Sequence, residues 1–191
     1  MATVREGSNT VLVVVDVQVG VMADAWDSER VIRNVGCAVE RARAEGVPVV
    51  WVQHSDGELP YGSAEWLWVP ELVPTAGETL IHKTFNSSFE HTELEQELVK
   101  LGANRIALAG AATNWCIRAT AYGALDRGYD VILIEDAHTT STMELDDGKK
   151  IEASQVVEEL NICMTWINYP DRTNGTATAA NVDFTPLGGQ G

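Results

Sequence analysis

The chain has 191 residues, of which 45% are hydrophobic and 21% are charged. This length and composition predict one globular domain with a sizeable core, and they exclude a disordered chain, a collagen and a coiled coil. The formal net charge is −15, so phosphate backbones and anionic lipids would repel the protein, and we expect neither a nucleic acid nor a membrane as its partner.

Short apolar runs rich in β-branched residues alternate along the chain with longer amphipathic stretches. Such runs are typical of strands that are buried on both faces of a parallel sheet. The alternation predicts an α/β fold, with a single doubly wound, mainly parallel six-stranded sheet and helices on both faces. The expected strands are 11–15, 47–52, 80–81, 106–109, 131–134 and 162–167, and the expected helices are 28–45, 92–100, 114–127 and 148–160.

Two segments fall outside this alternation. Residues 54–78 form a long predicted loop that carries Tyr61 and Trp66, and loops of this length are often functional. Residues 171–191 are rich in Thr, Asn, Ala and Gly and have little to bury. We expect them to form a tail that is flexible or packed on a neighbouring subunit, and residues 1–170 to form the folded domain.

The start of the chain and its cysteines predict a compartment. The first residues have no apolar core and no small-residue cleavage site, so we expect no signal peptide. The apolar runs are too short to cross a bilayer. Cys37, Cys116 and Cys163 are too few and too scattered for a disulfide framework. We therefore expect a cytoplasmic protein with free thiols.

Several familiar ligand motifs are missing from the sequence. The turn after the first predicted strand has no G-x-G-x-x-G, and the chain has neither a P-loop lysine motif nor a G-x-S-x-G elbow. The four histidines lack the spacing of a zinc site. We expect no cofactor and no metal.

Three polar residues stand where predicted strands end. Asp16 closes the run VLVVV, Lys83 follows TLIH, and Cys116 lies just beyond the strand that ends near Gly110. The carboxyl ends of parallel strands share one sheet edge, where ligands bind. At a helix start, the dipole and the free N–H groups favour a thiolate, and a nearby ammonium lowers the pKa of the thiol further. A carboxylate beside both could take the thiol proton and return it to a leaving amine.

The same three residues also fit plain structural roles. Asp16 could end a strand, Lys83 could be a surface lysine, and Cys116 could be a small buried hydrophobe, as most free cysteines are. The residue pattern alone leaves both interpretations open.

A series of longer motifs resembles the isochorismatase-like cysteine hydrolases, the superfamily of nicotinamidase and N-carbamoylsarcosine amidase. In order, they are VVVDVQVG, VVWVQHSD, ETLIHKTFNSSFEHTELEQEL, IALAGAATNWCIRATAYGALDRGYDV and IEDAHTT, and they span most of residues 11–140. The resemblance implies that family's Rossmann-like topology and assigns Asp16, Lys83 and Cys116 to its catalytic triad. It also implies a cis peptide between Ala111 and Ala112, and an oxyanion hole built from the backbone N–H groups of Ala112 and Cys116.

The resemblance further implies a hydrolase that cleaves a carbon–nitrogen bond of a small molecule through a thioester on Cys116. An amide, a carbamoyl or ureido compound, or a lactam would fit this chemistry as the substrate. Three alternatives stay open. They are the ether cleavage of isochorismatase proper, which does not rely on a cysteine; nicotinamide hydrolysis, whose Asp-x-His metal site is replaced here by QHSD; and a catalytically silent binding or scaffold homologue, against which the intact triad argues.

The substrate pocket is predicted less directly. Gln18 would share a strand face with Asp16, and His54 would stand at the end of the second strand. Trp66, Phe85 and Trp115 could stack against a flat substrate, although each also suits core or subunit-interface packing. His138 is expected to buttress a loop. The family implies a homo-oligomer, a dimer or larger.

Overall fold

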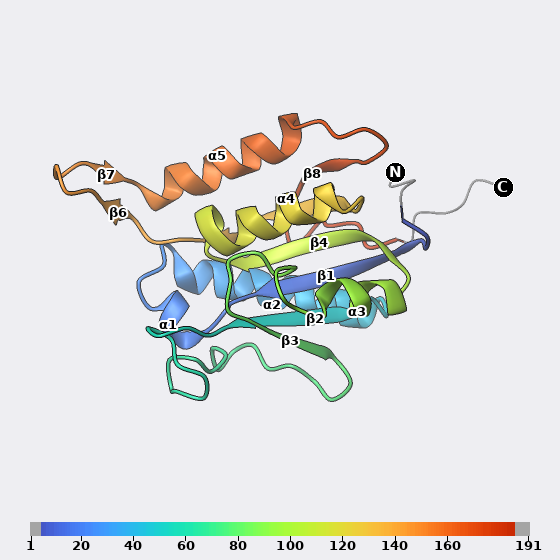
Figure 1. Ribbon diagram of the computed structural model, residues 1–191, viewed down its shortest axis with the longest axis horizontal. Helices are drawn as coiled ribbons and strands as arrows, with labels where there is room; N and C mark the ends of the chain where they lie inside the picture. The colour runs from blue at the N-terminus through green and yellow to red at the C-terminus, as the bar shows by residue number, and fades with distance from the viewer. Residues whose placement is uncertain (1–4, 186–191) are drawn as a thin grey trace.

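A six-stranded sheet runs through the middle of the protein (Figure 1), and the computed structural model describes residues 5–185. The strand order is β3-β2-β1-β4-β5-β8, and every neighbouring pair is parallel. The fold class predicted from the sequence is therefore confirmed. The strands are β1 (Asn9–Val15), β2 (Val49–His54), β3 (Thr79–Lys83), β4 (Ala103–Ala111), β5 (Asp130–Thr139) and β8 (Asn174–Ala177).

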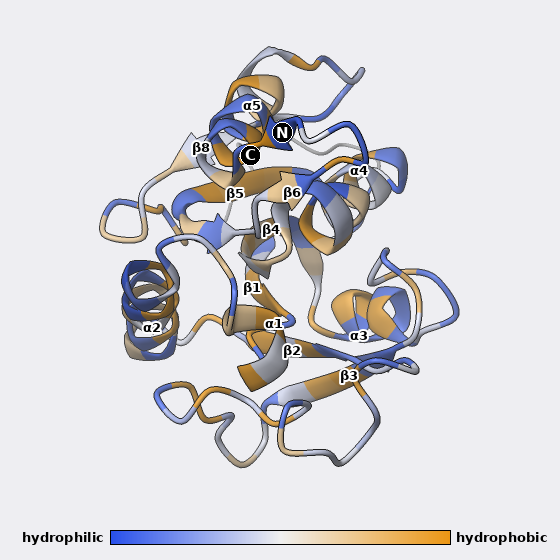
Figure 2. Cartoon of the chain, turned by 90° about the vertical axis from the view of Figure 1, so that its left-hand side faces the viewer, coloured by the Kyte–Doolittle hydropathy of each residue, from blue (hydrophilic) through white to orange (hydrophobic). Residues whose placement is uncertain are grey.

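Helices cover both faces of this sheet, and Figure 2 shows α2 on one side and α3 and α4 on the other. No helix among the described residues is long and apolar enough to cross a membrane. The helices are α1 (Val19–Met22), α2 (Ser28–Ala44), α3 (Leu94–Lys100), the π-helix η1 (Thr113–Ile117), α4 (Arg118–Asp126) and α5 (Ala153–Trp166), and a separate antiparallel pair is formed by β6 (Met143–Glu144) and β7 (Lys150–Ile151).

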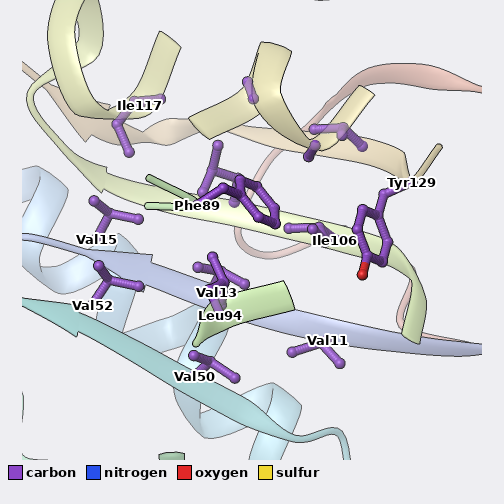
Figure 3. Close-up of a cluster of buried hydrophobic side chains, with 14 of the residues drawn as sticks. Val11, Val13, Val15, Val50, Val52, Phe89, Leu94, Ile106, Ile117 and Tyr129 are labelled. Carbon is purple, nitrogen blue, oxygen red and sulfur yellow. The ribbon is translucent and has the colours of Figure 1, made fainter. Parts of the chain in front are cut away.

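The central strand β1 shows why its apolar run is continuous. Val11, Val13 and Val15 point to one face, where they pack with side chains from α3 and α4 (Figure 3). Leu12 and Val14 point to the other face, toward α2. Because successive strand residues alternate between faces, a strand covered on both sides must be apolar at every position.

The predicted strand 162–167 is wrong, because those residues belong to the end of α5 and the linker after it. Leu160 and Met164 are fully buried on one face of this helix, whereas Ile162 and Trp166 are 50% and 80% exposed. The apolar run therefore mixes the buried face of a helix with its exposed face, and it has no strand character.

The sixth strand is β8, which lies in the segment expected to be a tail. It pairs with β5 along Asn174–Ala177, and all four of its residues are half-buried, as suits an edge strand. Ala179, Val182 and Phe184 are buried against the α2 side of the sheet. Up to residue 185 the segment therefore packs on its own chain, and the rest of it lies outside the described residues.

Gly110 brings the ends of β4 and β1 together at the carboxyl edge of the sheet. Its φ is +124°, and a Cβ atom there would lie 1.9 Å from the carbonyl oxygen of Val15. Only glycine allows this backbone and this approach. The next peptide bond, Ala111–Ala112, is cis, as the family resemblance implied.

Candidate active site

Asp16, Lys83 and Cys116 meet at the carboxyl edge of the sheet. Lys83 Nζ lies 2.6 Å from Asp16 Oδ2 and donates a hydrogen bond to Cys116 Sγ at 3.2 Å. Asp16 and Lys83 are each 2% exposed and Cys116 is 8% exposed. The structure thus brings together the three residues that the sequence predicted to form a triad.

Each triad residue lies at, or shortly after, the carboxyl end of a strand. Asp16 follows β1 with a φ of +52°, a left-handed conformation that aspartate tolerates better than most residues, and its N–H donates to Val52 O at 2.8 Å. Lys83 is the last residue of β3, on the same buried face as Ile81. Cys116 lies in the π-helix η1 directly after β4, and single π turns occur frequently at functional sites.

Burial, together with the Asp16 carboxylate, raises the pKa of the Cys116 thiol to about 12, although the Lys83 ammonium opposes this rise. The expectation of a lowered thiol pKa is therefore wrong for the resting protein. The helix start and the ammonium were recognised from the sequence, but the loss of hydration and the adjacent carboxylate outweigh them. Both effects favour the protonated thiol.

Burial also raises the pKa of Asp16 above its ordinary value, against the attraction of Lys83. Within the described part of the chain, Asp16 Oδ1 has no hydrogen-bond partner. Burial thus favours the protonated form of both Asp16 and Cys116, between which a proton can pass, and Lys83 lies beside both possible anions. Moving that proton leaves the net charge of the site unchanged, so the site can exchange it without creating an uncompensated buried charge.

The turn before Cys116 presents backbone donors. The carbonyl of Ala112 accepts hydrogen bonds from the N–H groups of Trp115 and Ile117, both at 3.1 Å, and this winds the chain into η1. Among the hydrogen bonds of residues 5–185, none uses the Ala112 N–H. The N–H groups in the first turn of a helix also lack a carbonyl from a preceding turn. Ala112 and Cys116 can therefore offer two donors to an oxyanion.

The side-chain amide of Gln18 is fully engaged with backbone groups of its own chain. Its Nε2 donates to His54 O at 3.0 Å and to Trp66 O at 2.8 Å, while its Oε1 accepts from the His54 N–H at 2.9 Å. Both amide protons and the carbonyl are used, and the side chain is fully buried. The side chain of Gln18 therefore links the end of β2 to the loop of residues 54–78 through hydrogen bonds.

The ring of Trp66 packs against two neighbouring rings. Its ring centroid is 4.5 Å from that of Tyr61 and 5.7 Å from that of His82. His82 precedes Lys83 in β3, so the two side chains point to opposite faces of the sheet. The Trp66 ring therefore packs on the face of β3 opposite Lys83.

His54 does reach the triad. Its Nδ1 lies 3.4 Å from Lys83 Nζ and its Nε2 lies 3.0 Å from Asp56 Oδ2. Sequence reasoning gave Asp56 no role here, although the H-x-D spacing in QHSD could have suggested the pair. A pocket of about 360 Å³ adjoins this pair, and its lining comprises Gly20, Val21, His54, Asp56, Glu58, Leu59 and Glu65.

The two remaining aromatic candidates lie at the surface. Phe85, two residues after Lys83, is 48% exposed, and Trp115, which precedes Cys116, is 54% exposed. Their exposure leaves the prediction that they stack against a substrate as a prediction. Residues 5–185 contain no group of three or more His, Cys, Asp or Glu side chains that could hold a metal ion, so the residues described do not fit a metal site of the nicotinamidase kind.

A model of the isochorismatase domain matches residues 10–166. The chain belongs to the isochorismatase family. Streptothricin hydrolase from Streptomyces noursei is 36% identical over 138 residues, a match that covers 68% of this chain and 54% of that protein. An uncharacterized isochorismatase family protein from Bacillus subtilis (strain 168) is 31% identical over 148 residues, covering 72% of this chain and 82% of that one.

Solved structures support the fold of this isochorismatase-family protein. An isochorismatase from Pseudomonas putida KT2440 superposes with a TM-score of 0.80 at 23% identity, over 90% of this chain and 89% of that one. A cysteine hydrolase from Pseudomonas syringae pv. phaseolicola 1448A gives a TM-score of 0.78 at 20% identity, also over 90% and 89%. Identities this low establish the shared architecture alone.

A polar cluster contacts the cysteine turn, which comprises Ala112 and the π-helix η1. His138 near the end of β5 is fully buried, and its two ring nitrogens lie 2.9 Å from Thr113 Oγ1 and 2.9 Å from Asn161 Oδ1. His138 was expected to buttress a loop, but its side-chain partners lie on the π-helix η1 and on α5. Its partners could not be recognised from the sequence, because they lie 25 and 23 residues away on different elements.

Proposed function

We propose that this isochorismatase-family protein is a cysteine hydrolase that cleaves a carbon–nitrogen bond of a small molecule through a thioester intermediate. The observation that carries the proposal is the position of Lys83 Nζ, within hydrogen-bond distance of both Asp16 Oδ2 and Cys116 Sγ. A nucleophile, a base and a group that orients both are the elements of nucleophilic catalysis. The family supports a hydrolase, and the bond class is our inference.

In the first half of the proposed reaction, Asp16 takes the proton of Cys116 as the sulfur attacks the substrate carbonyl carbon. The ammonium of Lys83 stays beside the carboxyl and the sulfur throughout, so no buried charge loses its partner. The backbone N–H groups of Ala112 and Cys116 bind the oxyanion of the tetrahedral intermediate. Protonated Asp16 then gives its proton to the leaving nitrogen, the carbon–nitrogen bond breaks, and ammonia or an amine departs.

The second half hydrolyses the thioester. The Asp16 carboxylate accepts a proton from water as the water oxygen attacks the thioester carbon. Collapse of the second tetrahedral intermediate breaks the carbon–sulfur bond, and the proton on Asp16 returns to the Cys116 sulfur. The products are a carboxylic acid and the original site. The raised pKa of Asp16 suits this use as both base and acid.

One relative guides the choice of test substrates, and the pocket beside His54, whose lining includes no triad residue, contributes only a size. The pocket beside His54 has a volume of about 360 Å³, which lies at the small end of the range for ligand sites, roughly 300–1,000 Å³. The similarity to streptothricin hydrolase makes streptothricin a reasonable member of the test panel. We therefore include cyclic as well as open-chain amides among the proposed substrates.

A release assay tests this proposal. Purified protein is incubated with open-chain amides, ureides, carbamoyl amino acids, lactams including streptothricin, nicotinamide and isochorismate, and the released ammonia, amine or acid is measured. We expect turnover of at least one carbon–nitrogen substrate, its loss in Cys116→Ala, and its retention in Cys163→Ala, whose thiol lies on α5. Turnover that survives in Cys116→Ala, or cleavage of the ether alone, would contradict a cysteine-dependent amide hydrolase.

A further inference from the structure

A series of four hydrogen-bonding groups runs from β5 and α5 to Thr113, the first residue of η1. Asn161 Nδ2 on α5 donates to Glu135 O at 3.1 Å, and Asn161 Oδ1 lies 2.9 Å from His138 Nε2. His138 Nδ1 lies 2.9 Å from Thr113 Oγ1. Thr113 and His138 are both fully buried, so water does not compete for the bond between them.

The Glu135 carbonyl, at the far end of this series from Thr113, determines which group donates and which accepts in each hydrogen bond. The Glu135 carbonyl can only accept, so the amide nitrogen of Asn161 faces it and the amide oxygen faces His138. His138 Nε2 must then carry the ring proton, which leaves Nδ1 as an acceptor and makes the Thr113 hydroxyl a donor. Burial lowers the pKa of His138 to about 4, which keeps the ring neutral near neutral pH.

Thr113, the last residue of this hydrogen-bonded series, lies between the two proposed oxyanion donors in the sequence. Thr113 follows Ala112 and begins η1, the π-helix that carries Cys116. The neighbouring Asn114 is held as well, because Thr140 at the end of β5 donates its hydroxyl proton to Asn114 Oδ1 at 2.6 Å. Two successive residues of the turn are therefore tied to the carboxyl end of β5.

We propose that His138, oriented by Asn161, is a positioning residue that holds the cysteine turn through Thr113, so that the Ala112 and Cys116 N–H groups keep the placement an oxyanion requires. This inference rests on the proposed function, and it assigns part of that function to residues that touch neither the sulfur nor the substrate. Supporting groups of this kind matter because catalytic donors must be held within about 0.5 Å of their productive position.

The role has a chemical signature that a purely structural bond would lack. Acylation of Cys116 by an ester passes through a tetrahedral oxyanion, so its rate depends on the two backbone donors. Alkylation of the same sulfur by iodoacetamide displaces iodide from a saturated carbon and develops no oxyanion at the carbonyl. Loosening the turn should therefore slow acylation selectively, while the rate of alkylation stays close to that of the wild type.

The test compares these two rates in the full chain, with p-nitrophenyl acetate as the acylating probe. Thr113→Val removes the hydroxyl at nearly constant volume, and Thr113→Ser keeps it. Thr120→Val is a matched control, because Thr120 is 1% exposed and donates its hydroxyl proton to Ser88 Oγ at 2.9 Å, outside the turn. His138→Gln probes the same series from the β5 side and serves if Thr113→Val does not fold.

We expect Thr113→Val to acylate roughly 10- to 100-fold more slowly, with an unchanged alkylation rate, because small misplacements of catalytic groups have effects of this size. Thr113→Ser should keep most of the acylation rate, and Thr120→Val should change neither rate. Equal slowing of both reactions, or no slowing of either, in Thr113→Val and His138→Gln would overturn the positioning role. A wild-type Cys116 that is alkylated but never acylated would overturn the proposed function itself, and the positioning role with it.

Discussion

The ammonium of Lys83 lies 2.6 Å from the carboxylate of Asp16, and the two side chains are 0% and 3% exposed. Both charges have left water, so each depends on the other for compensation. Removing one partner of such a pair typically costs about 3–5 kcal/mol, because the remaining charge is left buried alone. We expect Lys83→Met to lower the free energy of unfolding by that amount in urea titrations, and to abolish turnover. A variant as stable as the wild type would show that the pair is not buried in solution.

Asp16→Asn separates the two effects of the carboxylate on Cys116. The carboxylate raises the pKa of the thiol, so its removal should lower that pKa from about 12, while Lys83 remains to favour the thiolate. Asparagine also tolerates the left-handed backbone at this position. We expect alkylation of Cys116 by iodoacetamide to begin at a lower pH, whereas turnover falls by roughly 100-fold or more because the base is gone.

The control for this variant is Asp24→Asn, which neutralises an exposed carboxylate and should move neither quantity. The pH profile of alkylation, followed by intact-protein mass, gives the measurement. A thiol that becomes less reactive in Asp16→Asn would contradict the assigned cause of the raised pKa.

His138 makes stability depend on pH below neutrality. Burial holds its pKa at about 4 in the folded protein, against 6.5 for a free ring, so the unfolded chain takes up a proton first as the pH falls. The contribution of the neutral ring to the free energy of unfolding is fully present above the pKa of the unfolded chain. As the pH falls from about 6.5 to about 4, the protein loses about 3 kcal/mol of this free energy.

Urea unfolding at about pH 7 and about pH 4.5 measures this loss. His138→Gln lacks the titrating ring, so its stability should fall less than that of the wild type between the two conditions. His91→Gln, whose ring is exposed, should behave as the wild type does. An equal pH dependence in all three proteins would mean that the His138 ring is not held neutral.

Gly110 should not accept a side chain. A Cβ atom would meet the carbonyl oxygen of Val15 at 1.9 Å, and the φ of +124° is unfavourable for any other residue. We expect Gly110→Ala to destabilise the protein by about 2–4 kcal/mol in thermal or urea unfolding. Gly57→Ala, where the added methyl meets nothing within 4 Å, should change stability by less than about 0.5 kcal/mol. Similar values for the two variants would contradict the close approach of β4 to β1.

The strands that could be predicted from sequence are those whose burial makes them apolar throughout. β1, for example, is buried at six of its seven positions. β8 could not be found in this way, because an edge strand is defined by its backbone pairing with β5, and its residues NGTA bury little. The prediction of a strand at 162–167 failed because α5 exposes apolar side chains at Ile162 and Trp166, so an apolar residue there does not indicate burial.

The meeting of Asp16, Lys83 and Cys116 could be expected because each stands at or after a strand end and parallel strands end at one edge. The family resemblance, and not this pattern, favoured a triad over plain structural roles. The surroundings of these three residues could not be predicted from the sequence. The raised pKa of Cys116 depends on how completely the fold removes water, and the bonds of His138 depend on which elements pack together. The partners of Gln18 and Trp66 could not be predicted either: the amide of Gln18 bonds to the backbone of His54 and Trp66, and the ring of Trp66 packs on Tyr61 and His82.

The central claim is that the sulfur of Cys116 carries the acyl group during turnover. Rapid acid quenching during steady-state hydrolysis, followed by intact-protein and peptide mass spectrometry, tests this most directly. We expect the mass of the acyl fragment on the peptide that contains Cys116, its removal by neutral hydroxylamine as a thioester requires, and its absence in Cys116→Ala. Sustained turnover with no acyl adduct on Cys116, or with an adduct on another residue, would contradict the account.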